Sequence, residues 1–88
     1  MKSYVVSYDL IKRKNYPELL DALKQFNYWH CLDSFWIIKS DSTAEQIYNY
    51  LRPHIDGDDR LIVILLYRES VWTPSFSTEC QNWLRTNL

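Results

Sequence analysis

Asp9 is the residue of this sequence that is best suited, by type and position, to bind a metal ion. It follows a strand-like run of β-branched and aromatic residues, and a carboxylate at the end of a strand is a suitable ligand for Mg²⁺ or Mn²⁺. One aspartate per chain is too little for a rigid site. Two copies brought together by symmetry could hold an ion, because the metal relieves the repulsion between their carboxylates. The alternative is an aspartate that only caps a turn.

Three consecutive cations follow Asp9 and could hold the phosphates of a nucleic acid. Lys12, Arg13 and Lys14 precede a predicted helix, whose first amides could add to an anion site. The alternative is a solvated run of charges.

Two further polar residues lie farther along the chain. His30 could act as a general base, because the usual pKa of histidine is near 6.5; the alternative is a hydrogen-bonded structural residue in an aromatic strand. Ser34 could hydrogen-bond a phosphate, but no Gly-x-Ser-x-Gly motif surrounds it, which favours a turn residue. The acidic residues at 56, 58 and 59 do not have the spacing of a calcium loop and predict a turn.

Composition limits the classes of protein to consider. The chain has 88 residues, enough for one domain over 1–88, and its 4 Trp, 7 Tyr and 3 Phe exclude a disordered chain. A single Gly and 3 Pro exclude collagen-like and low-complexity sequences. The net charge of −1 means that any binding of nucleic acid must depend on a local basic patch.

The cysteines and the N-terminus predict a cytoplasmic protein that does not enter a membrane. Cys31 and Cys80 have no metal-binding or disulfide spacing, which favours two reduced thiols. The first residues lack the pattern of a secretory signal. The longest apolar run, residues 61–67, is far shorter than the roughly 20 residues of a membrane span.

Hydrophobic periodicity predicts two helices with capping boxes. The first begins at Asn15, with Glu18 three residues later, and ends near residue 26 or 27. The second begins at Ser42, with Glu45 at the matching position, and frays at Pro53.

Four strands and a tail complete the prediction. The strands cover residues 4–10, 28–32, 35–39 and 61–66. Asp33 and Ser34 lie between the middle two, which form a hairpin or one bent strand; a hairpin or bulged pair is favoured. The unbroken apolar run of 61–66 predicts a strand buried on both faces. Residues 71–76 are irregular or an edge strand, and a short helix begins at Thr78.

This β-α-β-β-α-β order predicts an α+β, ferredoxin-like fold. Its four-stranded antiparallel sheet would carry both helices on one face and leave the other face uncovered. Aromatic residues on a wet face are rare in small domains, which favours a homodimer formed through that face or through the tail at 71–88. Trp72 and Phe76 are the predicted interface residues of this tail.

The motifs and their order resemble the small adaptation protein of CRISPR systems, the second Cas protein, and its toxin-like relatives of the VapD kind. The resemblance is closest to the short group often labelled SinR-like. It covers about residues 3–67 and rests on these segments: Tyr8-Asp9, Lys12-Arg13-Lys14, Trp29-His30-Cys31-Leu32-Asp33-Ser34, Trp36-Ile37-Ile38-Lys39 and Asp58-Asp59-Arg60-Leu61. His30 stands where the family often has arginine, and Phe35-Trp36 follows Ser34 in place of Val-Phe.

The resemblance implies a ferredoxin-like homodimer in which Asp9, with Tyr8 before it, meets its copy across the two-fold axis. In some members the aspartate pair holds Mg²⁺ or Mn²⁺ and hydrolyses a phosphodiester, as an endoribonuclease-like enzyme. In other members the same dimer grips duplex DNA without catalysis. The sequence therefore predicts a metal-dependent nuclease, or alternatively a non-catalytic module that binds RNA, DNA, a nucleotide or a protein partner.

Overall fold

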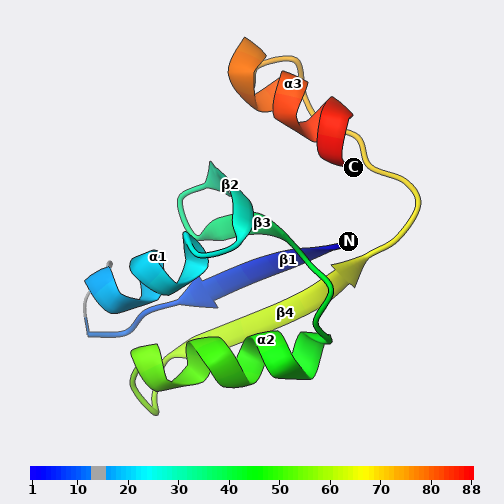
Figure 1. Ribbon diagram of the computed structural model, residues 1–88. Helices are drawn as coiled ribbons and strands as arrows, with labels where there is room; N and C mark the ends of the chain where they lie inside the picture. The colour runs from blue at the N-terminus through cyan, green and yellow to red at the C-terminus, as the bar shows by residue number, and fades with distance from the viewer. Residues whose placement is uncertain (13–15) are drawn as a thin grey trace.

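The protein folds as a four-stranded sheet with helices on both of its faces (Figure 1). The computed structural model describes residues 1–12 and 16–88. Its elements, in chain order, are β1 (Lys2–Asp9), α1 (Pro17–Leu23), β2 (Asn27–Leu32), β3 (Phe35–Ser40), α2 (Ala44–Leu51), the 3-10 turn η1 (Arg52–His54), β4 (Arg60–Leu66) and α3 (Thr78–Asn87).

All neighbouring strands of the sheet are antiparallel, and β1 is a central strand. The strand order is β2-β3-β1-β4, with β1 paired to β3 on one side and to β4 on the other. Val6 lies opposite Trp36 of β3 and Val63 of β4, which sets the register of all three strands. The predicted α+β class, the antiparallel sheet and the β2–β3 hairpin around Asp33 and Ser34 are confirmed.

The main core lies between the sheet and the first two helices. Tyr4, Val6 and Tyr8 alternate along β1 and point to this face, as the period of two in a strand requires. Trp36 and Ile38 join them from β3, both fully buried. The helices complete the cluster with these buried residues: Leu19, Ala22, Leu23, Ile47 and Leu51.

The opposite face is partly covered, where the sequence predicts an uncovered face. The C-terminal segment packs back on it and forms a second cluster around Ile37, Cys80 and Leu84. Figure 1 shows α3 apart from α1 and α2. Its largest set of contacts is with β2, and the backbone oxygen of Asn87 also accepts hydrogen bonds from Lys39 of β3 and Ser3 of β1.

β4 is an edge strand, and its predicted burial on both faces is wrong. Ile62 and Ile64 point to the α3 side of the sheet yet are 52% and 48% exposed. They lie opposite Ser7 and Val5 of β1, toward the Arg60 end of β4, whereas Leu66 near the other end of the strand packs against the second cluster. We call Ser7, Ile62 and Ile64 the open half-face. Leu61 and Val63, which alternate with Ile62 and Ile64 along this apolar run, pack on the main core.

Both helix starts lie one residue later than predicted. The N-cap of α1 is Tyr16, and the predicted Asn15 lies outside the described residues. The capping box of α2 is made by Thr43 and Gln46, not by Ser42 and Glu45. Threonine at N-cap and glutamine at N3 supply the same reciprocal bonds.

Pro53 ends α2 as predicted, since the chain tightens there into η1. Residues 71–76 form no strand, and α3 starts at the predicted Thr78 with Ser77 as its N-cap. Within the described part of the chain, no helix has the length and apolar character needed to cross a membrane.

A buried hydrogen bond links the end of β1 to the middle of the core and can be tested. The indole Nε1 of Trp36 donates to the hydroxyl of Tyr8 over 3.0 Å. Tyr8→Phe leaves this buried donor without its acceptor. We expect the free energy of unfolding, measured by urea denaturation, to fall by about 1–3 kcal/mol.

Tyr28→Phe is the matched control, because the Tyr28 ring packs against the same indole with centroids 5.3 Å apart but is only half-buried. Its effect should stay within about 0.5 kcal/mol. Equal losses in the two variants would show that the bond to Trp36 contributes nothing specific.

Candidate functional site

Asp9 and Arg60 form an exposed ion pair at one end of the sheet. Nη1 of Arg60 lies 3.7 Å from Oδ2 of Asp9, and the two side chains are 80% and 66% exposed. Their contact follows from the register, since the last residue of β1 lies opposite the first residue of β4. Both residues line a shallow hollow of about 220 Å³, together with Ser7 and Ile62 of the open half-face.

Asp59 ties the loop after β1 to the turn before β4. Its Oδ1 accepts the amide of Ile11 and its Oδ2 accepts the amide of Asp56, both over 2.8 Å. The Ile11 amide is the largest cause that lowers the pKa of Asp59 below its usual 3.8, partly opposed by burial. The Asp56 amide, the Tyr16 hydroxyl and the charge of Lys12 lower it further. This carboxylate thus fixes the backbone beside Asp9.

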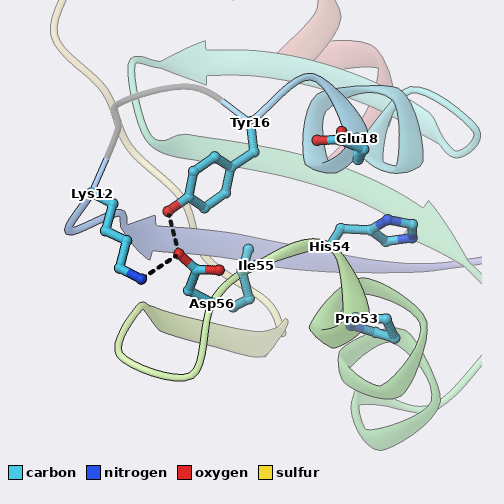
Figure 2. Close-up of a pocket in the computed structure, with 7 residues that line it drawn as sticks. All are labelled: Lys12, Tyr16, Glu18, Pro53, His54, Ile55 and Asp56. Carbon is cyan, nitrogen blue, oxygen red and sulfur yellow. Dashed lines mark hydrogen bonds and ion pairs between the residues drawn. The ribbon is translucent and has the colours of Figure 1, made fainter.

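A second and larger pocket, of about 480 Å³, lies on the other side of this loop (Figure 2). Lys12 and Tyr16 both point to Asp56: the amine lies 3.6 Å from its Oδ2, and the hydroxyl donates to the same oxygen over 3.3 Å. Burial raises the pKa of Tyr16, and the hydroxyl remains a hydrogen-bond donor at neutral pH. Glu18 and His54 line the opposite side.

The described residues of the sheet end can supply a carboxylate and two cations to a ligand, but they do not by themselves form a complete metal site. In residues 1–12 and 16–88, no group of three or more His, Cys, Asp and Glu side chains is close enough to hold an ion. Asp9 alone fits the one or two carboxylates that Mg²⁺ uses beside water. Water, substrate or a second copy could supply further ligands.

The predicted site residues lie at the same end of the sheet but differ in accessibility. The carbonyl of Ser34 accepts the amide of Tyr8 over 3.2 Å, so the β2–β3 turn adjoins the end of β1. Tyr8 itself points into the main core, and burial is the first cause that raises its pKa. It therefore faces away from Asp9 and does not exchange protons at neutral pH.

His30 lies on the edge strand β2, two strands away from β1. Its Nε2 lies 2.7 Å from the carbonyl oxygen of Asp33, and its ring stacks on Trp36 with centroids 3.9 Å apart. These contacts give His30 a structural role in the hairpin. They do not bring it to Asp9.

The remaining predicted residues are the three phosphate-binding cations and the two aromatic interface residues. Lys12 is described, whereas Arg13 and Lys14 lie outside the described residues. Trp72 and Phe76, predicted for a dimer interface, are half-buried against the second cluster of their own chain.

Arg60 and Tyr16 are the site residues that the sequence reasoning missed. Arg60 carries a signal: it starts the strand that must run antiparallel to β1, so it lies opposite the residue that ends β1. For Tyr16, the only signal in the sequence is its place before Pro17. Its hydrogen bond to Asp56, 40 positions away, depends on the tertiary fold.

Comparisons of the chain with protein-family models, curated proteins and solved structures found no match.

The pKa of Asp59 predicts how stability depends on acid. A pKa that is lower in the folded chain means that the ionised carboxylate stabilises the fold at pH values above its unfolded pKa. That stabilisation is lost as the pH falls through the folded pKa. We expect the Tm of the wild type to decrease at pH values below about 4. Asp59→Asn should lower the Tm at pH 7 by a few degrees and make the Tm depend less on pH in the acid range.

Asp58→Asn is the matched control, since Asp58 is an exposed neighbour in the same turn. Its acid limb should follow the wild type. An Asp59→Asn variant with an unchanged acid limb would contradict the role of this carboxylate.

Proposed function

We propose that this chain is a homodimeric, nucleic-acid-associated protein of the kind it resembles, with Asp9 of each copy contributing to a Mg²⁺ or Mn²⁺ site that cleaves a phosphodiester. The observation that carries the proposal is the position of Asp9. Its carboxylate is 66% exposed at the end of a central strand, beside the open half-face. A second copy on that half-face would approach Asp9 directly.

A ferredoxin-like topology is part of this proposal. The order β2-β3-β1-β4, with β1 antiparallel to both of its neighbours, supports it. So do α1 and α2, which connect β1 to β2 and β3 to β4 and pack on the same face of the sheet.

The dimer has to form face to face for the two Asp9 residues to meet. In an edge-to-edge dimer, two antiparallel β4 strands would put their Arg60 ends at opposite ends of the joint. The Asp9 copies would then be separated by about 20 Å along the strands, at about 3.4 Å per residue. Packing through Ile62 and Ile64 covers apolar surface and keeps both sheet ends near the two-fold axis.

The metal, when bound, would activate a water and stabilise charge on the phosphate. The chain's own residues would position the substrate. Arg60 is 80% exposed beside Asp9 and Lys12 is 67% exposed on the adjoining loop. Exposed ion pairs are weak, so a phosphate can draw both cations away from their carboxylates. Ser34, in the neighbouring turn, is a further hydrogen-bond donor.

The observation that favours a second function is the ion pair of Asp9 with Arg60 in a chain of net charge −1. The positive charge of the paired arginine weakens the attraction of the carboxylate for a metal cation. The second function is a non-catalytic module that binds nucleic acid, a nucleotide or a protein partner with the same surface.

The dimer is tested with two substitutions on the same strand. Ile64→Lys places a charge on the open half-face, whereas Leu65→Lys places it on the opposite face at a similar exposure, 48% against 46%. We expect analytical ultracentrifugation to find the Ile64→Lys chain monomeric, and the wild type and Leu65→Lys dimeric. A monomeric wild type at all concentrations would overturn the dimer. Dissociation by both substitutions would point to the β4 edge.

The catalytic function is tested with Asp9→Asn in a nuclease assay. Single- and double-stranded RNA and DNA are incubated with Mg²⁺, Mn²⁺ or EDTA. We expect cleavage by the wild type only with metal, and at least a 100-fold loss in Asp9→Asn, because the amide is a poor ligand for a hard cation.

Asp41→Asn is the control, since Asp41 is an 88%-exposed carboxylate paired with the N-terminus. Equal cleavage by all three proteins would mean that Asp9 is not the ligand. No cleavage by a folded dimer would favour the binding module, whose affinity for nucleic acid should fall steeply with salt if Lys12 and Arg60 contact phosphates.

A further inference from the structure

The two cysteines of the chain pack into one cluster on the sheet face that α3 covers. Cys31 lies on β2 and Cys80 in the first turn of α3, and both belong to the second cluster with Ile37 and Leu84. Cys80 is 4% exposed, whereas Cys31 is accessible in part. Their separation of 49 positions in the sequence gives no sign of this contact.

β2 and α3 each contribute one cysteine to this cluster. Trp29 lies opposite Ile37 and packs toward α3. Cys31 lies where the β2–β3 pairing shifts register, between His30 and Leu32, and its side chain packs against the same cluster. On α3, Cys80 and Leu84 are four positions apart and share its buried side. The hydroxyl oxygen of Ser77 accepts the amide of Cys80 over 3.1 Å, which holds the first turn in place.

Cys80 also affects the pKa of Cys31. Burial, followed by the charge and hydrogen bonding of Cys80, raises the pKa of Cys31 to about 11. The thiolate fraction of Cys31 is therefore small at neutral pH, and its reaction with an oxidant is slow there. A thiol pair with such slow oxidation stays reduced in the absence of oxidative stress.

We propose that Cys31 and Cys80 are an oxidisable dithiol whose intramolecular disulfide fastens the C-terminal segment to its own sheet. The oxidant is a low-molecular-weight disulfide. The thiolate of the more accessible Cys31 attacks one of its sulfurs and releases one thiol, leaving a mixed disulfide. Cys80 then loses its proton, attacks the sulfur of Cys31 and releases the second thiol, so two protein thiols are oxidised and one small disulfide is reduced to two thiols.

The consequence is a fixed α3 and a fixed connection between β4 and α3. In the reduced chain this segment is held by the half-buried side chains of Trp72, Phe76 and Trp83, in addition to Cys80 and Leu84. Closing a loop of 49 positions removes much of the conformational freedom of the unfolded chain. We expect the oxidised form to melt on the order of 10 °C higher than the reduced form.

The test uses the full chain, treated in the folded state with oxidised glutathione at mildly alkaline pH. We expect two thiols to disappear in a thiol assay, the intact mass to fall by about 2 Da, and no cross-linked dimer to form. The Tm should rise and return to its original value with reductant. Oxidation should be faster as the pH increases toward the pKa of Cys31.

Cys31→Ser and Cys80→Ser are the paired controls. Neither can close the bridge, so the Tm of each should not rise on treatment. Stable glutathione adducts, a disulfide-linked dimer of the wild type, two persistent thiols or an unchanged Tm after oxidation would each overturn the proposal. The outcome does not depend on the nuclease function, because none of these measurements uses Asp9 or a nucleic acid.

Discussion

The alternation of side chains along β1 is the constraint on which the rest of the structure depends. Because β1 is hydrogen-bonded to a strand on each side, its register is fixed and its side chains must alternate between the two faces of the sheet. Tyr4, Val6 and Tyr8 therefore enter the main core, and Val5 and Asp9 belong to the opposite face. A slip of one residue would bury the Asp9 carboxylate beneath the helices, where its charge would have no solvent and no Arg60.

The charges at the sheet end are paired locally in a chain of net charge −1. Arg60 faces Asp9, and Lys12 faces Asp56. The two carboxylate oxygens of Asp59 accept hydrogen bonds from backbone amides and so fix the loop that carries Lys12. The exposed pairs can exchange their carboxylates for a phosphate at low cost, whereas the amide bonds of Asp59 hold the frame unchanged.

The sequence predicts local features well and contacts between distant elements poorly. The Asp33-Ser34 turn and the end of α2 at Pro53 follow from residue type and spacing. The exposure of Ile62 and Ile64 does not, since an apolar run has the same pattern at the edge and in the middle of a sheet. The place of Asp9 at a strand end could be predicted, but its pairing with Arg60 requires the β1–β4 register. The cluster of Cys31 with Cys80 requires the position of α3.

The open half-face is a geometric consequence of having one helix on that side. Four strands about 4.8 Å apart span about 14 Å between their outer axes, whereas a helix with its side chains is about 10 Å wide. Two helices, α1 and α2, can therefore cover the main-core face, but α3 alone covers about two strands. The second cluster includes Ile37 of β3 and reaches Leu66 near one end of β4, so Ile62 and Ile64 are left exposed toward the Arg60 end of that strand. Fastening α3 by a disulfide would keep this division, so the surface beside Asp9 would stay available to a second copy.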